Sequence, residues 1–326
     1  MPNDPAEVDR ARLERRYRDA AAFGTVGWTV RMAGRNLGWI RREGIGRLVE
    51  EHELDPRRRL RLALGRARWR HTHRGYREPA TPVYLCGAPR SGTNMMVRGL
   101  SELPSVQTYN EGDRAAFRRY RLRADADVLT LVAASRQRVV LFKPLLDSHR
   151  LASLLDLPTA VAGRGIWAYR DVDGRARSAL SKFGPSALII LREIAADRRS
   201  ARWQAQGMSR ATHDLLREVD WDATTPADAA ALMWLVRNRL FFDLALDTRP
   251  EVMALSYDAV VADPDTALRA VCRHVGLPWT PPVSAAVDRR SAGSPPLDLS
   301  PWVRALCDDL GRRLDAAAAR PIVPPA

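Results

Sequence analysis

A glycine-rich loop between a predicted strand and a predicted helix is the clearest chemical feature of the sequence. Residues 84–94 read YLCGAPRSGTN, in which a short apolar run breaks at Gly87, and the helix-like run MMVRGLSEL follows. In a strand–loop–helix unit of this kind, backbone amides and the positive end of the helix dipole face the same point. The loop therefore predicts a binding site for an anion such as a phosphate.

The loop lacks the lysine that a nucleotide kinase requires. Those enzymes read GxxxxGK[ST], and the lysine reaches the β- and γ-phosphates. Here Thr93 follows Gly92 directly, and the cation lies inside the loop, at Arg90. A phosphotransferase with a phosphate-binding P-loop therefore stays an alternative, which turnover of ATP with magnesium would support.

The segment PRSGTN resembles the 5′-phosphosulfate loop of sulfotransferases that use 3′-phosphoadenylyl sulfate (PAPS). In that family the loop reads P-[KR]-S-G-T-[TSN]. Its basic residue touches the bridging oxygen and the sulfuryl group, and its small polar residues hold the 5′-phosphate. The resemblance implies these roles for the following residues: Arg90, Ser91, Gly92, Thr93 and Asn94.

A second motif places an arginine at a predicted strand end and a serine on the next helix. In IWAYRDVDGRARSALS, Ser178 follows Arg170 by 8 residues. This resembles the family's 3′-phosphate motif R-[ND]-P-x-D-x-x-x-S, with Val172 for the usual proline and Asp173 one position early. A guanidinium can bind two phosphate oxygens at once, and the hydroxyl adds a donor. The resemblance assigns both residues to the 3′-phosphate; a surface salt bridge is the alternative for Arg170.

A third stretch, LSYDAVVADPDTALRAVCRHVGLPW, resembles the family's YEDL…DP…L…FLGL segment, with Asp258 in place of the glutamate. The resemblance implies that Tyr257 contacts the adenine. A buried tyrosine hydrogen-bonded at a strand end is the alternative. Arg289 and Arg290 loosely match the family's late basic loop over the 3′-phosphate. Together the matches cover about residues 82–280 in the family's order.

Sulfuryl transfer to a hydroxyl needs a base for the acceptor's proton and cations for the developing charge. Many family members use a histidine two residues after a lysine, but Leu145 occupies that position after Lys143. Another branch places a glutamate beyond the helix that follows the loop, and Glu111 lies 22 residues after Pro89. The resemblance implies Glu111 as the general base. It would follow a short strand, at the sheet edge where open α/β folds place their sites.

Several alternatives accompany this catalytic assignment. Glu111 could be a solvated loop residue, with Asp113 as its nearest rival and His149 as a reserve candidate for the base. Lys143 and Lys182 are the only lysines among 52 basic residues, and this rarity suggests that a compact ammonium matters at its position. We assign Lys143 to the sulfuryl group or the bridging oxygen, against the alternative of a plain strand-end lysine.

Apolar runs of strand length alternate with helical runs after residue 80. Residues 139–144, 165–170 and 252–257 predict buried strands, and residues 186–206, 226–247, 263–277 and 302–319 predict helices. This alternation favours a parallel sheet covered on both faces. The expected fold is therefore a three-layer α/β P-loop fold, like nucleotide kinases and sulfotransferases, over residues 81–320. A helical, arginine-rich extension is expected over residues 1–80.

Composition limits the classes of protein and of binding partner that the sequence allows. Hydrophobic residues make up 46% of the chain, which argues against global disorder. The net charge of +14 is almost all arginine. It reflects either a compositional bias or, as a third functional hypothesis, a non-enzymatic binder of RNA or anionic membranes. With the loop as the guide, we expect no nucleic-acid partner, and we keep peripheral membrane contact open for residues 1–80.

Cysteine usage and the N-terminal segment indicate a cytoplasmic protein. The 3 cysteines show no CxxC spacing, and the first 20 residues lack the apolar core of a signal peptide. The histidines show no metal-ligand pattern, so we expect no metal. The expected co-substrate is PAPS, with adenosine 3′,5′-bisphosphate as its product. The acceptor could be a small molecule, a saccharide or a lipid, and the sequence does not specify the oligomeric state.

Overall fold

The computed structural model describes residues 55–200, 202–285, 287 and 295–324. The chain divides into two units, Met1–Ala63 and Leu64–Ala326. Of the predicted helical extension, residues 1–54 lie outside the described residues, and Pro56–Thr72 forms helix α4. Arg289 and Arg290 also lie outside them. The elements described below belong to the second unit.

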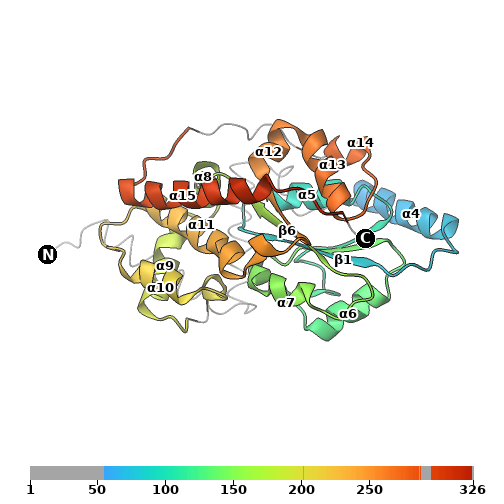
Figure 1. Ribbon diagram of the computed structural model, residues 1–326, viewed down its shortest axis with the longest axis horizontal. Helices are drawn as coiled ribbons and strands as arrows, with labels where there is room; N and C mark the ends of the chain where they lie inside the picture. The colour runs from blue at the N-terminus through green and yellow to red at the C-terminus, as the bar shows by residue number, and fades with distance from the viewer. Residues whose placement is uncertain (1–54, 201, 286, 288–294, 325–326) are drawn as a thin grey trace. The chain divides into compact units, whose positions relative to one another are not determined.

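Five parallel strands form the central sheet, in the order β2-β5-β1-β6-β7 (Figure 1). In this spatial order they span Val106–Tyr109, Val139–Phe142, Thr81–Gly87, Arg164–Tyr169 and Val252–Ser256. Val83 pairs with Leu141 on one side and with Arg164 on the other, so β1 is the middle strand. The chain leaves β1 for one edge of the sheet and later returns to its other side. Open α/β sheets place ligand sites at such a switch point, beyond the carboxyl ends of the strands.

Side chains of β1 alternate between two hydrophobic cores. Val83 and Leu85 pack on one face of the sheet, and Tyr84 and Cys86 pack on the other. Helices α5 (Thr93–Leu100), α12 (Tyr257–Ala262) and α13 (Pro264–His274) cover the first face (Figure 1). Helices α6 (Asp125–Ala133), α7 (Leu151–Leu155), α9 (Ser186–Ala196), α11 (Pro226–Asp243) and α15 (Pro301–Ala318) supply the second core. Because both faces are covered, the inner strands β1, β5 and β6 are almost wholly buried, and the three-layer α/β fold is confirmed.

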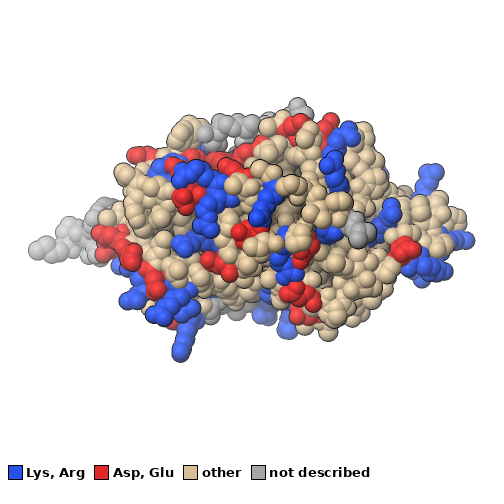
Figure 2. All heavy atoms as spheres, in the orientation of Figure 1, with Lys and Arg blue, Asp and Glu red and all other residues tan. Residues whose placement is uncertain are grey.

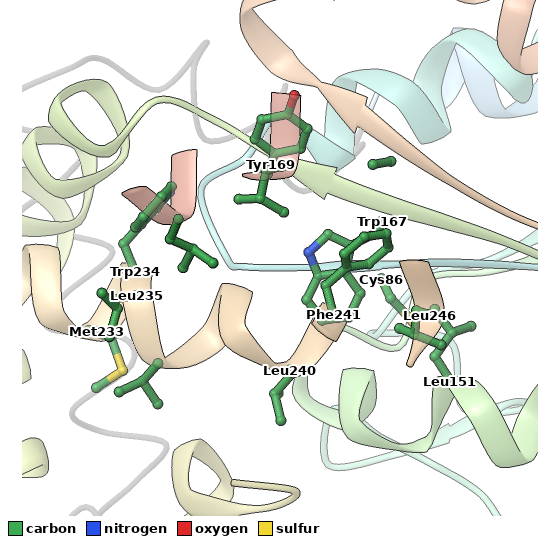
Figure 3. Packing of buried hydrophobic residues seen from close by; sticks show 14 of the residues in the cluster. Cys86, Leu151, Trp167, Tyr169, Met233, Trp234, Leu235, Leu240, Phe241 and Leu246 are labelled. Atoms are coloured by element: carbon green, nitrogen blue, oxygen red, sulfur yellow. The ribbon is translucent and has the colours of Figure 1, made fainter. Parts of the chain in front are cut away.

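Helix α11 anchors the second core to the sheet (Figure 3). The rings of Trp167 on β6 and Phe241 on α11 lie 5.7 Å apart. The Trp167 indole donates to the Asn238 side chain at 3.2 Å, and the Trp234 indole donates to the carbonyl of Arg170 at 2.7 Å. Both buried indoles therefore have partners, and the second bond fixes α11 at the carboxyl end of β6.

Two of the predicted helices end earlier than the sequence indicated. Helix α9 ends at Ala196 because Asp197 is extended, with φ −138° and ψ 108°, and residues 203–205 form a separate 3₁₀ turn, η3. Helix α11 ends at Asp243, and Ala245 adopts a left-handed conformation with φ 51°. Neither helix end carries the glycine or proline that usually marks such a position. The pattern of apolar residues therefore predicted both helices to be longer than they are.

Candidate active site

The glycine loop makes a tight turn at the carboxyl end of β1. Arg90 and Gly92 are both left-handed, with φ 75° and φ 74°, which costs an arginine about 1–3 kcal/mol. A Cβ atom at Gly92 would lie 2.1 Å from Cδ2 of Tyr257, so a side chain has no room there. The loop thus holds a strained shape that requires glycine at this position, as in other close-packed ligand loops.

The same loop contains donors without an acceptor in the part of the chain that the structure describes. The Ser91 hydroxyl is fully buried and has no hydrogen-bond partner. Within the described residues, no acceptor takes a bond from the backbone amides of Ser91, Gly92 and Thr93. Buried donors are almost always paired in native proteins. A loop with a partnerless hydroxyl and amides before a helix therefore fits an anionic group, which would supply the acceptors.

Helix α8 (Val172–Phe183) lies against the loop and carries the predicted serine to it. The Arg90 Nε atom donates to the Ser178 hydroxyl at 3.0 Å. One turn earlier, Arg175 donates to the carbonyl of Pro89 at 3.2 Å and to that of Ala230 at 2.9 Å. The structure therefore brings together the loop arginine and the serine, which are 88 residues apart in the chain.

Arg170 lies at the end of β6 and covers the ring of Tyr257. Its guanidinium carbon is 4.4 Å from the ring centroid, and a Cβ at Gly174 would lie 2.6 Å from its Nε atom. Because the same ring packs on Gly92, three distant segments form one stack of loop, tyrosine and arginine. Tyr257 is only 6% exposed. Tyr257 therefore lies between the loop and Arg170, and its contact with the adenine stays a prediction.

Glu111 and Lys143 meet beside the loop, at the carboxyl ends of β2 and β5. The Lys143 ammonium donates to the Asn94 side-chain oxygen at 2.5 Å and lies 3.4 Å from Oε2 of Glu111. The second carboxylate oxygen, Oε1, is buried without a hydrogen-bond partner. Burial raises the pKa of Glu111, while the charges of Lys143 and, more weakly, Lys182 lower it. A carboxylate with one anchored oxygen and one open oxygen can accept a proton from a bound hydroxyl.

The surroundings of the loop carry excess positive charge. Arg175 is almost fully buried and donates only to backbone carbonyls; no carboxylate of a described residue lies within 4 Å of it. Burial, with repulsion from Arg237 and Arg90, lowers the pKa of Arg175 to about 10. An anionic ligand at the loop would relieve this repulsion.

Three residues near the loop were not assigned a role from the sequence. Gly174 makes room for Arg170, Arg175 supports the loop, and the charge of Lys182 acts on Glu111. Only Lys182 had a readable signal, since it follows Ser178 by one helical turn and is the second of two lysines. The other two depend on packing between α8 and the loop, which a linear pattern does not contain.

The rival bases occupy different environments. Asp113 accepts a bond from the amide of Ala115 at 3.0 Å, which makes it a turn residue. His149 lies in the 3₁₀ helix η2 (Leu145–Arg150), where burial lowers its pKa to about 4. Among the residues that the structure describes, no three His, Cys, Asp or Glu side chains gather as a metal site. None of the described helices combines the length and apolar character needed to cross a bilayer.

The model of the sulfotransferase family matches residues 82–281. A comparison with curated protein sequences gives no significant match.

Three solved structures are similar. The first is a sulfotransferase from Alicyclobacillus acidocaldarius, with 18% identity and a TM-score of 0.43 over 76% of this chain and 98% of that one. The second is the sulfotransferase domain from the curacin biosynthetic pathway, with 12% identity and a TM-score of 0.39 over 72% and 99%. The third is the sulfotransferase domain from the Synechococcus PCC 7002 olefin synthase, with 14% identity and a TM-score of 0.37 over 76% and 98%.

The family model carries the assignment, because its match includes the loop, Glu111, Lys143, Arg170 and Tyr257 and extends over more than half of the chain. The chain belongs to the sulfotransferase family.

Proposed function

We propose that this sulfotransferase uses PAPS as its donor and transfers the sulfuryl group to a hydroxyl, with Glu111 as the general base. One observation carries the proposal: Arg90, Ser178, Arg170 and Tyr257 converge on one loop whose buried Ser91 hydroxyl has no partner among the described residues. Glu111 and Lys143 lie beside the same loop. This supports a site that holds a polyanion next to a carboxylate.

The residues of the site fall into two groups, those that would bind the donor and those that would act on the acceptor. PAPS would supply the sulfuryl group, and residues 90–94 would hold its 5′-phosphosulfate end. Arg170 and Ser178 would bind the 3′-phosphate. The open Oε1 atom of Glu111 takes the proton of the acceptor hydroxyl, and the ammonium of Lys143 stabilises negative charge at the transferring group.

The domain boundaries and the acceptor are part of the proposal. We place the sulfotransferase domain at residues 81–320 and treat residues 1–80 as an extension. On the face drawn in Figure 2, the described acidic side chains are interspersed with the basic ones, so this face does not support a general polyanion binder.

The donor site can be tested by calorimetry. Adenosine 3′,5′-bisphosphate should bind tightly, and ATP with magnesium should bind weakly. Replacing Arg170 by alanine should weaken bisphosphate binding about 10- to 100-fold, because a charged hydrogen-bond donor is lost. Arg210→Ala is the matched control, since that side chain is 82% exposed on α10 (Arg210–Arg217). Preference for ATP with magnesium would favour a phosphotransferase, and equal binding by the Arg170 variant would remove the 3′-phosphate assignment.

A further inference from the structure

Arg237 is a buried arginine with few polar partners among the described residues. The residue belongs to α11 and is only 1% exposed. It makes one long hydrogen bond, from Nη1 to the carbonyl of Gln204 at 3.4 Å, and its guanidinium carbon lies 5.0 Å from the Trp203 ring centroid. No carboxylate among the described residues lies within 4 Å of it. Burying an unpaired charge is costly, so its retention needs a reason.

The unused atoms of Arg237 are the two that form a carboxylate fork. Its Nε and Nη2 atoms are buried and have no hydrogen-bond partner. The same pair of atoms binds a carboxylate elsewhere in this protein. In Arg121 they donate to Asp147 at 2.8 and 2.5 Å, and in Arg202 they donate to Glu193 at 3.0 and 2.6 Å. In both cases the two atoms converge on one carboxylate oxygen, and Arg237 presents the same pair of donors with no acceptor among the described residues.

Two further unpaired polar atoms lie on elements near Arg237. They are Nδ1 of His149 on η2 and Oε1 of Gln204 on η3 (Trp203–Ala205), both buried. The two segments pack together. Just after η3, a Cβ at Gly207 would lie 2.4 Å from the His149 side chain and 3.2 Å from Leu240 of α11. Trp203 and Gln204, which contact the Arg237 guanidinium, are only partly buried, so this segment lies between Arg237 and the protein surface.

Apart from Arg175, the charged groups described here leave Arg237 as the one positive charge without a carboxylate beside it. Arg121 and Asp147 form an ion pair at 2.5 Å and neutralise each other, and Arg121 also donates to Gln206 at 2.6 Å. His149 is neutral near pH 7, because burial lowers its pKa to about 4. Arg175 lies on the side of the loop and repels Arg237. A singly charged carboxylate therefore matches the local charge better than a multiply charged phosphate.

The site adjoins the reaction centre. Trp234, one turn before Arg237 on α11, donates to the carbonyl of Arg170 at the end of β6. Asp147 acts electrostatically on both Glu111 and Arg237, so both lie within reach of one carboxylate. We propose that Arg237 binds a carboxylate of the acceptor through Nε and Nη2, with His149 as an additional hydrogen-bonding group. This inference rests on the proposed function and narrows the acceptor to a hydroxyl compound that carries a carboxylate.

The test uses two pairs of simple probes that differ in charge: benzoate with benzamide, and acetate with acetamide. Binding to the full-length protein is measured by calorimetry at pH 7, with and without saturating adenosine 3′,5′-bisphosphate. The carboxylates should bind at least about 10-fold more tightly than the amides, because each forms charged hydrogen bonds with the fork. Arg237→Met should abolish this difference, and Arg210→Met, on the exposed face of α10, should leave it unchanged.

Thermal unfolding separates this role from a structural one. Arg237→Met should unfold at the same or a higher temperature than the wild type, since replacing a buried unpaired charge by an apolar side chain is often stabilising. If the methionine variant does not fold, Arg237→Lys decides, because lysine keeps the charge but lacks the planar fork. The lysine variant should then lose the preference for carboxylates.

Two results would overturn the inference. One is wild-type protein that binds carboxylates no better than amides; the other is a preference that survives in the folded Arg237 variants. An incorrect assignment of PAPS as the donor would give a different result. Adenosine 3′,5′-bisphosphate would then not bind, while carboxylates would still bind in the titration without nucleotide. Bisphosphate binding without carboxylate binding would remove only the Arg237 site.

Discussion

Replacing Lys143 by methionine should make Glu111 harder to ionise. Burial already raises the pKa of Glu111, and the ammonium of Lys143 is the largest influence that opposes this. Removing that charge leaves the desolvation of the carboxylate without its main compensation. The protonated form should then persist to higher pH, and a base that must be ionised should lose activity on its acidic side.

The separation of the two charges sets the scale of the effect. At the 3.4 Å between Nζ and Oε2, two unit charges attract by about 5 kcal/mol at an effective dielectric constant of 20. One pKa unit corresponds to about 1.4 kcal/mol. Loss of only a third of that attraction would therefore move the titration of Glu111 upward by about one pH unit, which is easily measured. Methionine fills a similar volume, so the packing around β5 should change little.

Carbon-13 NMR of labelled glutamate side chains measures this directly and needs no acceptor. Glu111→Gln identifies the resonance, and the wild-type signal should titrate above the usual range for glutamate. Lys182→Met is the graded control. Its charge is the weaker of the two lysine influences on Glu111, so its shift should have the same direction and be smaller. Where turnover can be followed, the acidic limb of kcat/KM should move in the same order.

A Glu111 signal that titrates in the usual range in the wild type would refute the reasoning, because burial would then not control the carboxylate. So would an unchanged titration in the Lys143 variant. A larger effect of Lys182 than of Lys143 would mean that the ion pair across β2 and β5 does not form in solution.

The remaining predictions concern the loop and acid stability. Gly92→Ala should abolish bisphosphate binding, because its Cβ would meet the Tyr257 ring. Gly184→Ala, at φ 59° and ψ −149° with nothing within 4 Å, should cost about 1–3 kcal/mol of stability but leave binding unchanged; equal binding by the two variants would contradict a tight fit at the loop. Burial lowers the pKa of His274 to about 4. Between about pH 6.5 and pH 4, this histidine is therefore protonated in the unfolded chain but neutral in the folded protein. Stability to urea should thus fall as the pH drops from 6.5 towards 4, and His274→Gln should flatten this fall; an identical fall in both proteins would contradict the assignment.

The sequence determined the layered fold because strands and caps are local signals. Apolar runs predicted β5, β6 and β7 to within about a residue at most ends. The start of α13 was equally readable: Asp263 accepts a bond from the amide of Thr266 at 3.1 Å, and Pro264 follows at the first helical position. The ends of α9 and α11 were not readable, because backbone conformations at Asp197 and Ala245 depend on tertiary packing.

The sequence also determined which residues could hold a polyanion, since the loop and the Arg–Ser spacing are chemical patterns in a linear chain. Only the tertiary structure decided how they meet. It placed the Tyr257 ring between Gly92 and Arg170, and it set Glu111 3.4 Å from Lys143. It also left Arg237 buried with its fork unpaired. The physical reason is that burial and pairing of charges depend on elements far apart in the chain, and desolvation acts only once they have packed.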